Sequence, residues 1–266
     1  MPLEKKLPDY ADPPLDEVVL GVQFSPPNNY TSVHACGIWE LFRSEFPIVE
    51  EVPPLDSQVE TFGGTPGQEP SFTFGPPPVR GRMWFISADR SHLIQFQENR
   101  FLLNWRRRPA EGNYPRFAGI WSSFSTKLEA IASYFQQEFS TALKINQAEI
   151  TYVNLIEVEE FAQADKWIRL PESRNVDVES VNYKVVEILS SAGGPYGRFF
   201  NEIQSVLTKE RKKKALRWSL TFRGKPGGKF ISDCQQFFDD GHSRIVSRFD
   251  EFSTKHAHEM WGKNNE

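Results

Sequence analysis

The side chains in this sequence that are best suited to binding a ligand are three amides and one guanidinium that lie close together along the chain. They are Gln95, Gln97, Asn104 and Arg106. They recur at every second position of two apolar segments, so in an extended chain they project from one side. An amide both donates and accepts hydrogen bonds, and a guanidinium is a planar fork suited to carboxylate or phosphate. Such a face could hold a peptide, a nucleotide or a partner loop; the alternative is a solvated sheet face that binds nothing.

Aromatic and basic residues beside these amides extend the candidate binding site. The added residues are Trp105, Arg107, Tyr114 and Arg116. Aromatic rings interleaved with basic residues can stack on unpaired bases, although a strand position also suits Trp105 for the core. A second basic run, at residues 209–214, is expected to be a solvated hairpin tip. Nucleic-acid binding through local basic patches is therefore an alternative.

Other kinds of reaction chemistry lack a signature in the sequence. There is no G-x-S-x-G motif and no phosphate-binding G-x-x-x-x-G-K-[ST] motif. The five histidines are spaced as ordinary helix and loop residues, and Cys36 and Cys234 are expected to be small buried hydrophobes. We therefore predict no metal, no cofactor and no catalytic residue, and an enzymatic function is disfavoured.

The elements that must position the amides are three short strands in succession. Residues 83–87, 93–97 and 101–106 alternate between apolar and polar side chains, and turn-forming residues separate them. This pattern predicts an antiparallel meander with one apolar face, carrying Phe96, Phe101 and Trp105, and one polar face. Everything proposed for the amides depends on this register.

The rest of the chain alternates between strands and helices. Before the meander we expect a strand at 17–24, a helix at 30–46, a strand at 48–52 and a long irregular loop rich in proline and glycine at 53–79. A long helix with an aromatic stripe should cover 117–142. Beyond it we expect strands at 150–158, 181–189, 200–207 and 216–222, a short helix at 161–167, and a last helix at 232–256 with a capping box of Ser232 and Gln235.

This order predicts an α+β protein whose antiparallel sheet has two related halves, each covered by a long amphipathic helix. We divide the chain into an extended N-terminal segment at 1–16, a first half at 17–145 and a second half at 146–266, the halves forming one unit. Each half reads strand, helix, several antiparallel strands, long helix. We infer an internal duplication from that order, although the two halves share almost no residue identity.

Composition sets wider limits. The 266 residues carry a net charge of −4, which disfavours attachment to nucleic acid through overall charge. The 22 phenylalanines are expected to fill the space between sheet and helices. The first residues lack the apolar core of a signal peptide, and only two cysteines are present, so we expect a cytoplasmic protein without a membrane span or a disulfide scaffold.

Several separated motifs resemble those of a known family. They are PPLDEVVLGVQF at 13–24, IQFQENRFLLNWRR at 94–107, YPRF at 114–117, GHSRIVSRF at 241–249 and HEMWG at 258–262. In this order they resemble an uncharacterised, sporadically distributed bacterial family of about this length, described by a numbered family model with no assigned function. The resemblance implies an accessory gene of the kind often found in defence or in toxin–antitoxin pairing, and brings no catalytic residues.

Together these observations favour a cytoplasmic, non-enzymatic recognition protein that binds a protein partner encoded nearby. The rival hypothesis is a small-ligand protein with a cavity between the sheet and a long helix. If the amides form a solvated binding face, replacing Gln97, Asn104 and Arg106 by alanine should leave thermal stability nearly intact. The sequence identifies neither the partner nor the oligomeric state.

Overall fold

The computed structural model of the chain describes residues 7–56, 60–62, 81–108, 114–171, 177–208, 212–228 and 231–264. The N-terminal half contains β1 (Leu15–Phe24), α1 (Val33–Glu40), β2 (Ile48–Val52), β3 (Arg82–Ile86), β4 (His92–Gln97), β5 (Arg100–Arg106) and α2 (Arg116–Phe139). The C-terminal half contains β6 (Ile145–Glu157), the 3₁₀ turn η1 (Phe161–Gln163), α3 (Ala164–Trp167), β7 (Asn182–Ser191), β8 (Gly194–Leu207), β9 (Lys214–Gly224), α4 (Ile231–Phe252) and α5 (Lys255–Met260).

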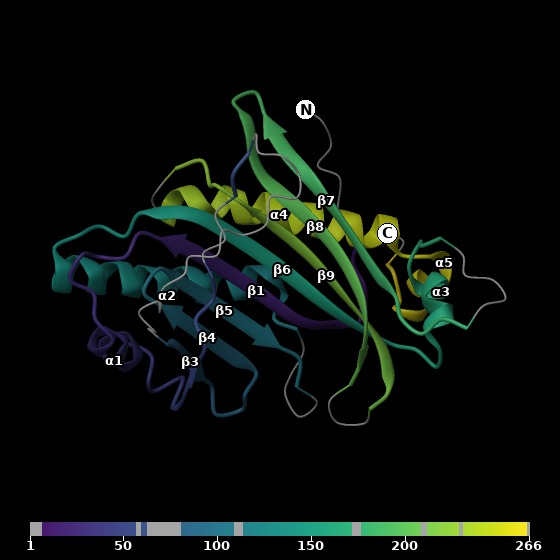
Figure 1. The fold of residues 1–266 in the computed structure, drawn as a ribbon, viewed down its shortest axis with the longest axis horizontal. Helices are drawn as coiled ribbons and strands as arrows, with labels where there is room; N and C mark the ends of the chain where they lie inside the picture. Colours follow the sequence, from purple (N-terminus) through teal and green to yellow (C-terminus); the bar gives the residue numbers. More distant parts are fainter. Residues whose placement is uncertain are drawn as a thin grey trace, which may run out of the picture.

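The strands form one nine-stranded antiparallel sheet in the order β2-β3-β4-β5-β1-β6-β9-β8-β7 (Figure 1). The α+β class is therefore confirmed. The two halves of the chain join where β1 pairs with β6, in a register that places Leu20 opposite Ile150. On either side of this junction, β5 flanks β1 and β9 flanks β6, so each half continues outward in the same manner. A common origin of the halves stays a prediction.

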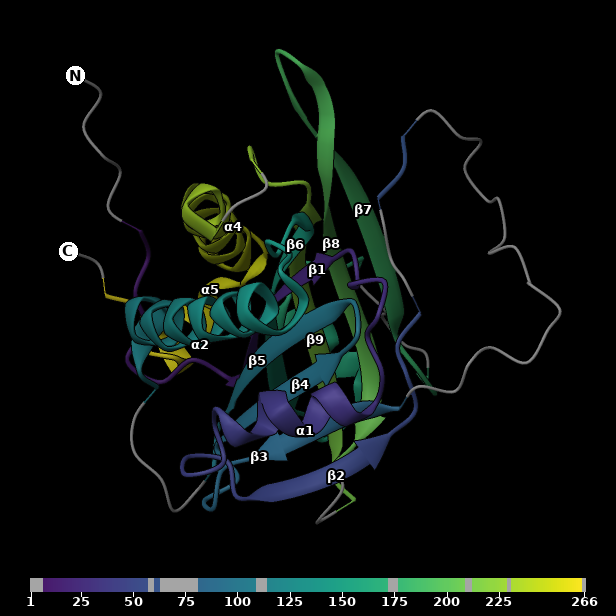
Figure 2. The same ribbon diagram turned by 90° about the vertical axis from the view of Figure 1, so that its left-hand side faces the viewer.

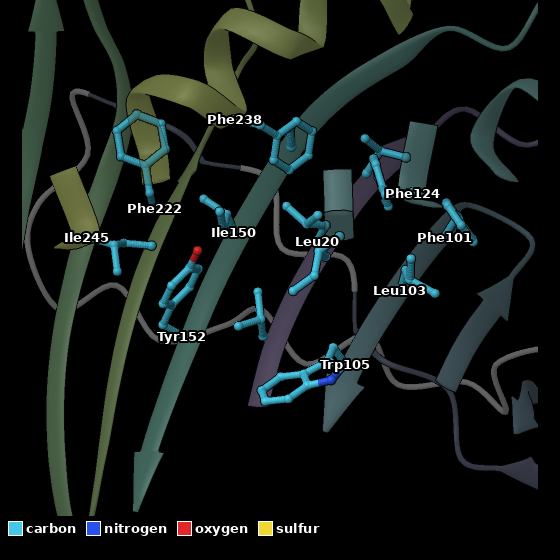
Figure 3. Packing of buried hydrophobic residues seen from close by; sticks show 14 of the residues in the cluster. Leu20, Phe101, Leu103, Trp105, Phe124, Ile150, Tyr152, Phe222, Phe238 and Ile245 are labelled. Atoms are coloured by element: carbon cyan, nitrogen blue, oxygen red, sulfur yellow. The ribbon is translucent and has the colours of Figure 1, made fainter. Parts of the chain in front are cut away.

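The long helices cover one face of the sheet (Figure 2). On α2 the buried side chains follow the predicted stripe through Phe124, Leu128, Ile131 and Phe135. The ring of Phe124 stacks on Phe101 of β5 with centroids 5.2 Å apart and meets Phe238 of α4 at the same separation. Figure 3 shows these rings with the apolar side chains of β1, β6 and β9 on the covered face. Aromatic side chains thus join both helices and the sheet in one core.

Close approach of α4 to the sheet depends on Gly241. A β-carbon at this position would come within 2.6 Å of Ile150 Cγ2 and 3.0 Å of Phe222 Cδ1. Both contacts are with core side chains of the central strands, which cannot move freely. The helix therefore lies against β6 and β9 at a distance that only glycine permits.

Three helices differ from their predicted bounds. The first is α1, which ends at Glu40 because the chain then turns; the turn is closed by the indole N–H of Trp39, which donates to the Phe46 carbonyl at 3.0 Å. Next, α2 ends at Phe139 because Ser140 adopts a left-handed conformation with φ of 51°. The last predicted helix is divided between α4 and α5, since Thr254 caps α5 by accepting a hydrogen bond from the Ala257 N–H. Finally, α4 is described from Ile231, so Ser232 lies inside the helix and the predicted capping box is wrong.

Within the described ranges, no helix has both the length and the apolar character needed to cross a bilayer. Most of the predicted loop at 53–79 lies outside the described residues, and so does part of the basic run at 209–214.

Candidate functional site

The candidate amides lie together on the face of the sheet opposite the long helices, as the period-two pattern predicts. Cross-strand pairing places Gln95 opposite Leu102 and Leu93 opposite Asn104. Because opposed residues share a face, this register determines the face on which each side chain of the two strands lies. Gln97 and Arg106 belong to the same side by alternation. We call this side of the sheet the polar face.

Hydrogen bonds join the polar side chains into a network. The Gln95 carbonyl oxygen accepts from Arg82 Nη1 at 2.7 Å and from the Trp84 indole N–H at 3.2 Å. Its amide nitrogen donates to Asn104 Oδ1 at 2.9 Å. The network continues to Glu17, whose Oε1 accepts from Asn104 Nδ2 at 2.8 Å and from Arg106 Nε at 3.0 Å. These amides are therefore fixed in orientation, as a preorganised binding surface requires.

The amides are also buried, which contradicts the alternative of a solvated sheet face. Gln95 and Gln97 are each 8% exposed, and Asn104 is 3% exposed. Because a buried amide left without a partner is destabilising, alanine at Gln97, Asn104 and Arg106 should lower stability. The sequence-based expectation of nearly unchanged stability is therefore corrected.

Part of this burial comes from the chain's own segment after β2. We call residues 53–56 and 60–62 the strap. The Gln97 side chain pairs with the backbone of Leu55: its Oε1 accepts from the Leu55 N–H at 2.9 Å and its Nε2 donates to the Leu55 carbonyl at 3.1 Å. Further along, Arg100 Nη2 donates to the Asp56 carbonyl at 2.8 Å, and Gln147 Oε1 accepts from the Glu60 N–H at 2.8 Å. Sheet side chains thus hold the strap mainly through its backbone.

One strap side chain enters a cluster of charges. The Glu60 carboxylate forms ion pairs with Arg198 of β8 and with Arg223 of β9, the latter at 3.5 Å. Arg223 also donates from Nε to Glu149 Oε2 at 2.8 Å. The Glu60 side chain is only 10% exposed, and the two arginine side chains are 24% and 19% exposed. The cluster is therefore partly desolvated, where charge pairs interact more strongly than at an open surface.

A third arginine lies close to this cluster. Arg100 is 3% exposed, and its Nε has no hydrogen-bond partner among the described residues. Burial lowers the pKa of its guanidinium from the ordinary value, with the charge of Glu149 opposing that change. Arg82 Nε, further along the polar face, is likewise buried without a partner in the described part of the chain. The polar face thus has hydrogen-bond donors that the described part of the strap does not use.

The other predicted binding residues lie elsewhere. Trp105 is on the helix side of β5, where its ring contacts Tyr114 at 5.1 Å. Tyr114 and Arg116, at the start of α2, line a cavity on that side. Arg107, at the end of β5, donates to Asp12 and to the Pro13 carbonyl. The eight predicted residues therefore do not form one site, because alternation along β5 sends Trp105 to the face opposite Asn104 and Arg106.

Sequence reasoning missed the residues that hold the strap from the second half of the sheet. They are Gln147, Arg198 and Arg223, together with Glu149, which pairs with Arg223. The period-two pattern of residues 216–222 could have indicated that Arg223 lies on the same side as Ser219 and Thr221. Nothing local could indicate that Arg198 and Arg223 lie side by side, since this depends on the pairing of β8 with β9.

The other residues considered in the sequence, namely the histidines, the cysteines and the second basic run, do not come together in one site among the described residues. His242 is a partly buried helix residue, as expected, but its hydrogen bond is to the distant Tyr152 and is not local. Cys36 is exposed, so only Cys234 is buried as predicted. In the second basic run, Lys213 and Lys214 pair with Glu157 and Glu160. The described residues contain no group of three or more His, Cys, Asp and Glu side chains placed to bind a metal.

Comparison with known proteins gives no further guide to the site. No protein-family model matches the sequence, and no curated protein is significantly similar to it. The resemblance to a sporadically distributed bacterial family thus stays a prediction.

Proposed function

We propose that this protein is a non-enzymatic recognition protein whose polar face binds an extended, acidic segment of a partner protein. The observation that carries this proposal is the way the face holds the strap. The Gln97 side-chain amide pairs with both backbone groups of Leu55, so it supplies the two hydrogen bonds that the backbone of a neighbouring strand would supply to a bound peptide. The strap is thus an internal example of the kind of segment that the face accommodates.

The preference for an acidic segment follows from the charges beneath the strap. Without Glu60, the cluster retains Arg100, Arg198 and Arg223 against the single carboxylate of Glu149. An incoming carboxylate would meet paired guanidinium groups that are already oriented by their neighbours. A basic or neutral side chain would leave partly buried positive charge without compensation.

The strap also sets a threshold for any partner. A tethered segment competes with an effective concentration on the order of millimolar. A partner present at lower concentration must therefore make more contacts than the strap does. The Nε groups of Arg82 and Arg100, which have no partner among the described residues, are donors through which a partner segment could form more hydrogen bonds than the strap does.

Nucleic-acid binding is a less supported alternative. Arg107 pairs with Asp12, and Lys213 and Lys214 pair with glutamates, so acidic neighbours offset the charge of these residues. Phosphate contacts would have to compete with those pairs. The suggestion of a partner encoded nearby rests on the family resemblance alone.

A peptide-binding experiment tests the proposal. The variant Glu60→Lys places a positive charge beside Arg198 and Arg223, so it should release the strap while leaving the polar face unchanged. We expect a fluorescein-labelled peptide with the sequence of residues 53–62, PPLDSQVETF, to bind this variant at least tenfold more tightly than the wild type, as measured by fluorescence anisotropy.

Two controls make the result specific. The peptide PPLDSQVKTF should bind the Glu60→Lys variant at least tenfold more weakly, and so should the acidic peptide when Arg198 and Arg223 are also replaced by alanine. Equal binding of the two peptides, or no saturable binding to a folded Glu60→Lys protein, would refute the proposal. If the charge reversal prevents folding, Glu60→Gln can replace it, because it removes the carboxylate that holds the strap without adding a positive charge.

A further inference from the structure

A cavity of about 240 Å³ lies on the helix side of the sheet, away from the polar face. Its walls come from the N-terminal segment, the start of α2, strand β6 and helix α4, and include Tyr10, Tyr114, Phe117, Tyr152, His242 and Ile245. Figure 3 shows Tyr152 on the covered side of β6, near Ile245 of α4. The recognition function proposed for the polar face makes no use of this space.

The cavity contains a chain of three hydrogen-bonding groups. The Tyr114 and Tyr152 hydroxyls form a hydrogen bond of 3.0 Å, and the Tyr152 hydroxyl forms another with His242 Nδ1 at 2.8 Å. The imidazole is held flat by the ring of Phe117, with centroids 4.3 Å apart and planes inclined by 4°. These groups come from the residues just before α2, from β6 and from α4, so the fold fixes their arrangement before any ligand enters.

The described residues leave one hydrogen-bonding position on His242 unused. Nδ1 of His242 is taken by Tyr152, and the described residues provide no hydrogen bond to Nε2. If the hydroxyl protons point toward the imidazole, Nε2 carries a proton and donates; if they point away, Nε2 accepts. A ligand hydroxyl can meet either arrangement because it both donates and accepts.

The surroundings favour an uncharged ligand. Burial lowers the pKa of His242 to about 4 and raises that of Tyr114 to about 12, so both groups are neutral near pH 7. Most of the other lining side chains are apolar, among them Ile245, Val246 and Phe249. The two charged lining side chains, Asp9 and Arg116, are partly exposed and form an ion pair with each other. An ion placed among the apolar walls would lose its hydration and would have to compete with that pair for an opposite charge.

The volume of the cavity limits the size of the ligand. A cavity of about 150 Å³ lined by apolar side chains binds benzene, and this one is larger by roughly the volume of a few substituent atoms. Its shape is supported by the N-terminal segment, which is fixed by hydrogen bonds from the Ala11 N–H to the Gly262 carbonyl and from the Asp12 N–H to the Trp261 carbonyl. We propose that the cavity binds a neutral single-ring aromatic molecule with one hydroxyl group, which hydrogen-bonds to His242.

Isothermal titration calorimetry with p-cresol, toluene and benzoate tests this proposal. We expect saturable binding of p-cresol, at least tenfold weaker binding of toluene because it cannot pair with His242, and no binding of benzoate because it is charged. The variant His242→Phe should bind p-cresol and toluene with similar affinity. Absence of saturable p-cresol binding, or binding of benzoate as tight as that of p-cresol, would overturn the proposal.

Filling the cavity provides an independent test. Val246→Trp should occupy the space and abolish p-cresol binding, whereas Ser247→Trp, at an exposed position one residue along α4, should leave it unchanged. Undiminished p-cresol binding by a folded Val246→Trp variant would place the ligand elsewhere. If that variant does not fold, Val246→Phe and p-cresol-induced NMR shifts of the Val246 methyl groups decide the same question.

Discussion

The side-chain amide of Gln97 pairs with both backbone groups of Leu55, 42 residues away along the chain, at 2.9 and 3.1 Å. This contact fixes the strap on the polar face of the sheet. It also explains why Gln97 is buried although it lies on the face that the long helices leave uncovered.

Gln97→Ala should lower the free energy of unfolding by about 1 to 3 kcal/mol, because the Leu55 backbone groups lose their partner while remaining near the sheet. Urea denaturation measures this loss. Gln136→Ala, at an exposed position on α2, is the matched control and should change stability by less than about 0.5 kcal/mol. Equal effects of the two substitutions would show that the Gln97 contact does not contribute to stability.

Gly241→Ala and Gly119→Ala should have opposite effects. Alanine is the better helix former by about 1 kcal/mol, so replacing the exposed Gly119 of α2 should be neutral or stabilising. At Gly241 the new methyl group would meet Ile150 and Phe222 within 3.0 Å, and we expect a loss of about 1 to 3 kcal/mol. Thermal unfolding of both variants checks the sign; stabilisation by Gly241→Ala would contradict the close packing of α4 on the sheet.

Trp218 and Asn201 should be energetically coupled. The indole N–H of Trp218 donates to Asn201 Oδ1 at 2.8 Å, and both side chains are at most 1% exposed. Trp218→Phe leaves that oxygen unpaired, so the double variant Trp218→Phe, Asn201→Leu should be more stable than the sum of the single losses predicts, by about 1 kcal/mol or more. A double-mutant cycle in urea measures the coupling, and additive losses would refute it.

Acid should destabilise the protein partly through His242. Burial lowers its folded-state pKa from 6.5 to about 4, so the unfolded chain binds more protons between these values. Stability therefore falls as pH decreases from about 6.5 toward 4, and this residue accounts for about 3 kcal/mol of the loss. The variant His242→Gln should lose less stability than the wild type between pH 7 and pH 4.5. Parallel losses in both proteins would show that His242 titrates normally.

The parts of this structure that depend on local periodicity could be predicted from the sequence. Alternation through β4 and β5 placed Gln95 and Asn104 on one face, and the spacing of Phe124, Leu128 and Ile131 identified the buried side of α2. Both patterns follow from the geometry of a strand or helix and do not require knowledge of distant segments.

The parts that depend on long-range pairing could not be predicted. Arg198 and Arg223 become neighbours only because β8 pairs with β9, and Glu60 reaches them from a segment without regular structure. The same holds for the cavity, where Tyr152 and His242 meet although 90 residues separate them. The predicted binding site was therefore wrong in one respect. It combined the amides of the polar face with Trp105, Tyr114 and Arg116, which lie on the opposite side of the sheet.

Hydrogen exchange of the Leu55 amide tests most directly whether the polar face holds an extended segment that another segment can replace. In the wild type this N–H donates to Gln97, so we expect slow exchange, and the peptide PPLDSQVETF at about 10 mM should accelerate it by displacing the strap. Exchange at the rate of an unprotected amide without peptide would contradict the account. So would a rate that peptide at about 10 mM leaves unchanged, because this concentration exceeds the effective concentration of the tethered strap.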